Sequence, residues 1–141
     1  MGFSATLSLL MRAREQLQML QRQSAVQVEQ ICKSLVFRTE SQKSVLLLVS
    51  GANRVKEKSI ERYIGEKIEK GDANFVYEKT GFAIGGIPPL GHKTAFDYVL
   101  IDETLAKLDS VWAAAGTPHS VFQIATNDLV RISGGQVASM G

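Results

Sequence analysis

Residues 31–51 read ICKSLVFRTESQKSVLLLVSG and contain the two segments that decide the fold. Residues 31–38 mix apolar and polar side chains in a strand-like pattern, and residues 44–50 form a continuous apolar run that ends at Gly51. A short apolar run closed by glycine is typical of a strand that is buried on both faces. The polar residues TESQ between the two segments predict a turn, so the stretch as a whole predicts a central β-hairpin.

Apolar periodicity and turn residues predict the elements that follow this hairpin. Helices are expected over residues 54–64, 72–81, 103–110 and 128–133, and strands over residues 96–102, 111–116 and 120–126. The segment GEKIEKG, residues 65–71, predicts either a turn or a short edge strand.

Five positions carry the residue types that begin or end helices. Asp72 and Asp102 are expected to cap the helices that follow them, and Gly81 is expected to follow a helix end. Asn127 or Thr126 is expected to cap the last helix, which would end at Gly134. These signals fix the order of the elements along the second half of the chain.

Residues 5–30 predict a helix, because Leu10, Ala13, Leu17 and Leu20 recur at spacings of three and four. With it, the sequence contains about six strands and four or five helices in mixed order. This pattern predicts an α+β, or mixed α/β, single domain whose central mixed, largely antiparallel sheet is flanked by helices.

Composition limits the classes of protein to which the chain can belong. The 141 residues suit one domain, and the net charge of +2 is too small to indicate nucleic-acid binding by itself. One cysteine, Cys32, excludes a disulfide framework and a multi-cysteine zinc site. No apolar run reaches the roughly 18 residues of a membrane span, and the first residues make a poor secretory signal. We therefore expect a cytoplasmic protein that has no metal, no cofactor and no membrane partner.

The loop GGIPPLGH, residues 85–92, combines three glycines with two prolines. Glycines allow another molecule to approach the main-chain N–H and C=O groups, while Pro88 and Pro89 restrict the backbone around them. A rigid loop of this kind can bind an anion or a carbonyl group. The alternative is a purely structural bend between two strands, and the spacing alone favours that alternative. The loop matches neither a Walker motif nor a dinucleotide fingerprint.

Single polar residues elsewhere in the chain are ambiguous by themselves. Lys33 lies inside an apolar strand pattern, where it is either an edge residue that extends to solvent or an inward cation that binds phosphate or carboxylate. His119, after Gly116-Thr117-Pro118, and His92 are each more often structural or exposed than catalytic. For Cys32 we expect a buried, inert thiol.

Five segments in this order resemble the YbaK family of aminoacyl-tRNA deacylases, also called the prolyl-tRNA-synthetase-associated domain. They are QICKSLVFR, LLLVSGANRV, TGFAIGGIPPLGH, VLIDETL and AAGTPHSVFQIATNDLVRISGG. The resemblance covers roughly residues 27–137, so we expect a divergent helical segment over residues 1–26 and a YbaK-like domain over residues 27–141.

The resemblance implies a trans-editing enzyme that hydrolyses the ester between a wrong amino acid and the 3′-terminal ribose of a tRNA. It implies that Lys33 holds a phosphate of the terminal adenosine or otherwise positions the substrate. It further implies that the GxxxP loop, which is Gly85, Gly86, Ile87, Pro88 and Pro89, contacts the aminoacyl carbonyl and the water or ribose hydroxyl through its backbone. Gly116, Thr117, Pro118 and His119 correspond to the loop that borders the amino-acid pocket.

The chemistry agrees with this assignment, because ester hydrolysis needs a positioned water and stabilisation of a tetrahedral oxyanion. The expected partners are the acceptor end of a mischarged aminoacyl-tRNA and an aminoacyl-tRNA synthetase, and DNA is not expected. Two other functions stay open at this point. One is a non-catalytic tRNA- or synthetase-binding module of the same fold, and the other is a small-molecule binder that uses the glycine loop for an anion.

Overall fold

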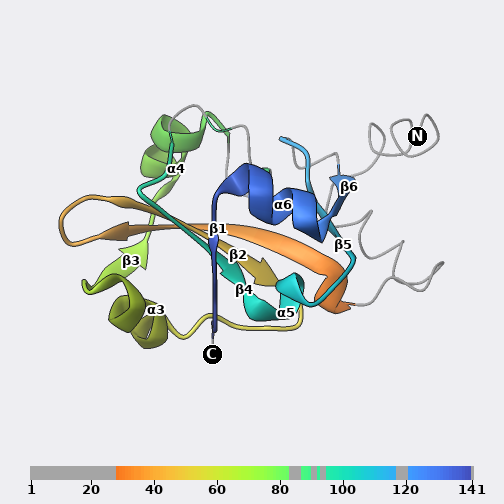
Figure 1. The fold of residues 1–141 in the computed structure, drawn as a ribbon. Coiled ribbons are helices and arrows are strands. Elements are labelled where there is room, and N and C mark those ends of the chain that lie inside the picture. The colour runs from red at the N-terminus through yellow and green to blue at the C-terminus, as the bar shows by residue number, and fades with distance from the viewer. Residues whose placement is uncertain (1–27, 83–86, 90–91, 93–94, 117–120, 141) are drawn as a thin grey trace.

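The computed structural model of the 141-residue chain describes residues 28–82, 87–89, 92, 95–116 and 121–140. The predicted helix over residues 5–30 lies outside this part of the chain except at its end, where Val28–Gln30 form a 3₁₀ turn, η1. The central hairpin is confirmed: β1 spans Ile31–Thr39 and β2 spans Ser44–Ser50. Figure 1 shows this hairpin running through the centre of the molecule.

The remaining elements follow the predicted order closely. The helices are α3 (Glu57–Ile64), α4 (Ala73–Thr80), α5 (Glu103–Ala106) and α6 (Thr126–Ser133). The strands are β3 (Ile68–Lys70), β4 (Tyr98–Asp102), β5 (Ser110–Ala114), β6 (Val121–Ala125) and β7 (Gln136–Ala138). Residues 65–71 thus contribute a short edge strand, and β7 is an additional strand that the sequence patterns did not predict.

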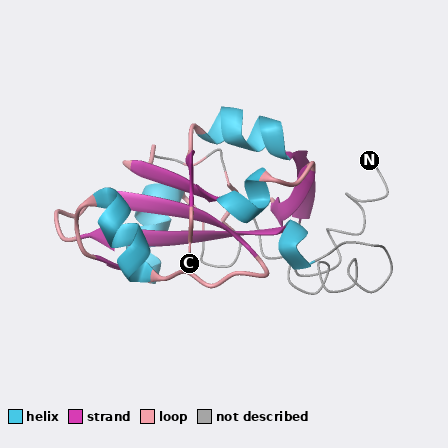
Figure 2. Ribbon diagram, turned by 60° about the horizontal axis from the view of Figure 1, so that its bottom comes forward, coloured by secondary structure: helices cyan, strands magenta, loops and turns pink. Residues whose placement is uncertain are grey.

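In the described part of the chain, the seven strands form one sheet in the order β6-β5-β1-β2-β4-β7, with β3 paired to β1. The pairs β1–β2, β1–β3 and β5–β6 are antiparallel, whereas β1–β5, β2–β4 and β4–β7 are parallel. The mixed sheet is therefore confirmed, with parallel and antiparallel pairs equally represented. Helices flank it on both sides, as Figure 2 shows.

Both faces of the β1–β2 hairpin are buried, which explains the continuous apolar run of β2. All seven residues of β2 are buried, and alternate side chains enter two separate clusters. The first cluster receives side chains from β1 (Cys32, Val36), β2 (Leu46, Leu48), α4, α5 and α6. The second receives Phe37, Val45, Leu47, Val49 and, from α3, Ile60.

Helix ends agree with the expected capping chemistry at two helices and differ at the last. Asp72 caps α4 through its carboxylate, Gly81 follows α4 in the left-handed conformation, and Asp102 caps α5. The N-cap predicted for α6 is wrong, because its N-cap is Ala125 and no side chain caps it, whereas Gly134 follows its last residue as predicted. Thr126 is instead the first helical residue, and its N–H already donates to the carbonyl of Asp109.

Candidate functional site

The sheet has an open segment along one edge of β1. On this edge, β5 pairs with Ile31 and Cys32, and β3 pairs with Phe37, Arg38 and Thr39. No strand in the described ranges pairs with residues 33–36 on this side. We call residues 33–36 the open edge of β1; Lys33 belongs to it, and Ile87 lines the cavity beside it.

Lys33 lies at the start of the open edge, and its side chain is partly buried. Its Nζ donates to the main-chain carbonyl of Asn53 at 3.1 Å. Lys33 pairs in register with Val49, a member of the second apolar cluster, so its side chain leaves β1 on that face of the sheet. The structure matches neither alternative left by the sequence in full. The ammonium is held by a main-chain oxygen of the protein itself.

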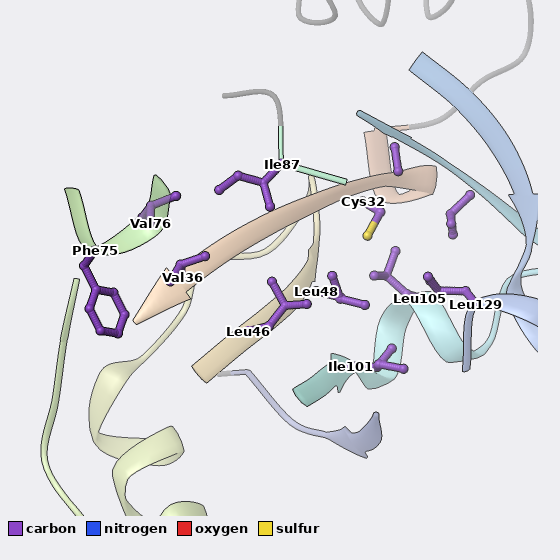
Figure 3. Close-up of a cluster of buried hydrophobic side chains, with 12 residues drawn as sticks. Cys32, Val36, Leu46, Leu48, Phe75, Val76, Ile87, Ile101, Leu105 and Leu129 are labelled. Carbon is purple, nitrogen blue, oxygen red and sulfur yellow. The ribbon is translucent and has the colours of Figure 1, made fainter. Parts of the chain in front are cut away.

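The described part of the GxxxP loop covers the opposite face of β1. Ile87 is 5% exposed and packs in the first apolar cluster with Val36, and Figure 3 shows it over β1 between Val76 and Cys32. Pro88 and Pro89 are buried as well. Because Val36 and Lys33 are three residues apart on one strand, Lys33 and Ile87 approach the open edge from opposite faces.

His92 stabilises this loop from within. Its Nε2 lies 2.6 Å from the carbonyl oxygen of Pro88, and its ring packs edge-on against Phe96 with the centroids 4.9 Å apart. Burial lowers the pKa of His92, and the hydrogen bond to Pro88 opposes this change only in part. The neutral imidazole therefore donates Nε2–H to the carbonyl of Pro88 and holds His92 against the proline pair.

The third predicted loop starts at Gly116, whose φ of 102° lies in the left-handed region that favours glycine. A Cβ at this position would lie 3.1 Å from the Phe82 ring. Phe82 lies three residues before Gly85, so the described ends of the two loops lie close together. Gly85, Gly86, Thr117, Pro118 and His119 lie outside the described residues.

A buried polar network at the end of β2 holds Asn53, whose main-chain carbonyl binds Lys33. No sequence pattern predicted this network. Asp102 is 1% exposed and accepts hydrogen bonds from the N–H groups of Ser50 and Thr104 and from Nδ2 of Asn53. The Asn53 amide also donates to Oγ1 of Thr104. Asp102 was expected only as a helix cap, and nothing local in the sequence indicates its second role on β2.

Cations lie at the other end of the open edge. Lys70 lines a cavity of about 260 Å³ beside it. Arg38 and Lys79 both lie near the Phe75 ring, at 5.5 and 5.8 Å from its centroid, and Arg38 also pairs with Glu69 at 2.6 Å. Phosphate groups that reach this end of the strand would meet positive charge.

Cys32 is buried, as expected, which favours the inert thiol that the sequence predicts. Burial, and secondarily the charge of Asp102, raises the pKa of its thiol to about 12. No group of three or more histidine, cysteine or acidic side chains within the described ranges is arranged to hold a metal ion. Across those same ranges, every helix is too short or too polar to cross a membrane.

Comparisons with known proteins indicate the family of the chain. The aminoacyl-tRNA editing domain family matches residues 12–132. The protein YwhH of Bacillus subtilis, which is uncharacterised, is 31% identical over 109 residues, which are 77% of this chain and 68% of YwhH.

Two solved structures have the same fold. A proposed trans-editing enzyme for prolyl tRNA synthetase superposes with a TM-score of 0.81 at 40% identity, over 91% of this chain and 78% of that one. The hypothetical protein APE2540 superposes with a TM-score of 0.79 at 23% identity, over 91% and 82%, which shows the shared fold alone. Since the family match spans most of the chain and includes the open edge with both loops, this protein belongs to the aminoacyl-tRNA editing domain family.

Proposed function

We propose that this protein hydrolyses the ester bond of a mischarged aminoacyl-tRNA in trans. Membership of the editing-domain family supports tRNA deacylase function in general. The observation that carries the proposal for this chain is the open edge of β1, which Lys33 approaches from one face and the Ile87–Pro89 segment from the other. Ile87 lines the cavity at this edge, and we propose that Lys33 meets the ester from the other face of β1.

The proposed roles follow from the chemistry that each group can supply. The Lys33 ammonium provides a point charge for the terminal phosphate or the ribose, and its bond to Asn53 keeps that charge in place. Gly85 and Gly86 let the ester approach the main chain, where amide groups stabilise the oxyanion. Pro88 and Pro89, buried against the sheet, hold those amides in position.

The third loop completes the proposed pocket. Gly116, in contact with Phe82, starts the segment Thr117, Pro118 and His119, which we propose borders the amino-acid side chain. Lys70 and Lys79 add positive charge for phosphates of the acceptor end, since tRNA binding depends largely on such contacts.

A non-catalytic tRNA- or synthetase-binding module is the second candidate. One observation favours it: the Lys33 ammonium is already bound to a protein carbonyl. A lysine held in this way serves binding as readily as catalysis. The module would bind tRNA without releasing an amino acid from it.

A deacylation panel tests these functions against each other. Purified protein is incubated with tRNA-Pro charged with alanine or cysteine and with tRNAs mischarged with serine or threonine, beside correctly charged controls. The solved structure of the proposed trans-editing enzyme for prolyl tRNA synthetase makes tRNA-Pro the first tRNA to try. Release from one mischarged species is the expected result, and tRNA binding without release would support the binding module.

The partner and location also belong to the proposal. We propose that an aminoacyl-tRNA synthetase supplies the mischarged tRNA and that the protein works in the cytoplasm, where tRNA is charged. Co-purification of a synthetase with the tagged protein from cells, and its loss when tRNA is digested, would show that the tRNA bridges the two proteins.

A further inference from the structure

A cavity of about 260 Å³ lies against the open edge of β1. Ser34, Leu35, Val36 and Phe37 line it from the strand, and Lys70, Gly71, Val76 and Ile87 line it from the elements around it. The apolar side chains of Val36, Val76 and Ile87 belong to the first apolar cluster, so part of the cavity wall is continuous with the core. Polar groups in such a wall are therefore informative about what binds there.

The main-chain groups of Ser34 point toward this cavity. Ile31 accepts from Gly51 and Thr39 donates to Lys43, so the odd-numbered residues of β1 direct their polar main-chain groups toward β2. Val36 accepts from Gly71 on the other edge, at 3.0 Å, so the even-numbered residues direct theirs away from β2. Ser34 lies between the residues that β5 and β3 pair, where no described strand meets its N–H or C=O.

The side chain of Ser34 carries a second unmet polar group. Its Oγ is buried and makes no hydrogen bond with any described residue. By strand alternation the side chain leaves β1 on the face of Val36 and Ile87, next to the cavity. A buried hydroxyl without a partner destabilises the fold, and an alanine at this position would avoid that cost. A ligand atom that reached this hydroxyl would remove that cost.

We propose that Ser34 recognises the free α-amino group of the aminoacyl ester, which rests on the function proposed above. An amine donates hydrogen bonds, and both the main-chain carbonyl and Oγ of Ser34 can accept them. The ester would then lie along β1 as an added extended residue. Val76 and Ile87 would contact its side chain, while Lys70 is exposed at the mouth of the cavity.

The substrate class that this site accepts follows from the amine. An N-acylated aminoacyl-tRNA keeps one amide N–H but loses the charge and the other donors of the ammonium, and it adds bulk where Ser34 and Gly71 line the wall, so the enzyme would hydrolyse it more slowly. Alanyl-, cysteinyl-, seryl- and threonyl-tRNA, each with and without N-acetylation, serve as probes. The wild-type protein should hydrolyse the N-acetylated form of its substrate about 10-fold or more slowly.

Ser34→Ala provides the decisive variant, and Thr126→Val provides its matched control. Thr126 carries the other described buried hydroxyl without a partner, and it lies in α6, away from the cavity. Both variants should melt no lower than wild type, because each removes an unpartnered buried hydroxyl. Only Ser34→Ala should lower kcat/KM, by about 10-fold on the free-amine substrate and far less on the N-acetylated one.

Different outcomes would overturn different statements. Equal loss on both forms of the substrate, unchanged turnover by Ser34→Ala, or a lower melting temperature of this variant would each refute the role of Ser34 while the deacylase function stands. Failure of the wild-type protein to hydrolyse any mischarged tRNA would refute the deacylase function itself and the role of Ser34 with it.

Discussion

The ammonium of Lys33 donates to the main-chain carbonyl of Asn53, twenty residues further along the chain, at 3.1 Å. The side chain of the same Asn53 donates to the buried carboxylate of Asp102 at 2.8 Å. The position of the Lys33 charge is thereby tied to the rigid end of the central sheet. A point charge that acts on a substrate benefits from such support, because misplacement by a fraction of an ångström weakens its effect.

Replacing Lys33 tests its part in the reaction directly. Lys33→Ala should lower kcat/KM for the mischarged tRNA on the order of 100-fold, because one preorganised charge is lost. The free energy of unfolding should change by less than about 1 kcal/mol, since among the described residues the substitution breaks one hydrogen bond, from the Lys33 ammonium to the carbonyl of Asn53. Deacylation and urea unfolding measure the two effects. Lys43→Ala, at the far hairpin turn, is the control; a large loss of stability in Lys33→Ala with normal turnover would make Lys33 structural.

Asp102 should affect both stability and activity. Asp102→Ala leaves the donors of Ser50, Asn53 and Thr104 without their acceptor, which should cost about 2–4 kcal/mol of unfolding free energy. It should also raise KM, because Asn53 no longer holds Lys33 in place. Asp97→Ala is the control, since Asp97 accepts from Ser44 at the opposite end of β2 and should reduce stability alone. Equal activity in the two variants would show that Asp102 does not support Lys33 through Asn53.

Gly116 and Gly65 form a matched pair that separates backbone strain from loop contact. Both have positive φ, 102° and 92°, so an alanine at either position should cost about 1–2 kcal/mol. A Cβ at Gly116 would meet Phe82, whereas a Cβ at Gly65 meets no atom within 4 Å. Gly116→Ala should therefore also lower deacylation, and Gly65→Ala should leave it unchanged. Similar activities in both variants would show that the contact between the two loops is dispensable.

His92 should make the loop sensitive to acid. Its pKa in the folded protein is below the ordinary 6.5, so the unfolded chain takes up the proton first as the pH falls. The contribution of His92 to stability is complete above about pH 6.5 and is lost as the pH falls through the folded-state pKa. Melting temperatures between pH 5 and 8 should fall more steeply for wild type than for His92→Phe. Parallel profiles would exclude His92 as the titrating group.

Cys32 should resist thiol reagents. Its side chain is 4% exposed and the pKa of its thiol is about 12, so both access and thiolate are lacking at neutral pH. Incubation of the folded protein with iodoacetamide should leave its mass and its deacylation rate unchanged. Modification should occur after denaturation in urea, and rapid modification without urea would contradict the buried position.

The fold was predictable where the signal is local. The apolar run of β2, the capping side chain of Asp72 and the left-handed Gly81 each act within a few residues, and all three are confirmed. The strand β7 was missed because its three residues, QVA, lack a run or an alternation long enough to be recognised. The sequence patterns predicted fewer parallel strand pairs than the structure has, because these pairs join strands that are far apart in the sequence.

The site was predictable only in part. Lys33 and the Ile87–Pro89 segment came from the family resemblance, and their placement on opposite faces of β1 depends on strand register. The bond between Lys33 and Asn53, the second role of Asp102 and the unpartnered hydroxyl of Ser34 all arise from contacts between distant segments. Patterns within a single sequence contain no direct signal for such contacts.

The short length of the open edge has a consequence for the solubility of the protein. An uncovered strand edge invites pairing with another chain and so promotes aggregation. Among the described residues, β5 pairs with β1 as far as Cys32, and Gly71 bonds to β1 at Val36. The stretch between them is three residues long, or roughly 10 Å of strand. A foreign strand of ordinary length would collide with β3 or β5 at either end. Pairing of another chain along this edge of β1 is therefore blocked by β3 and β5.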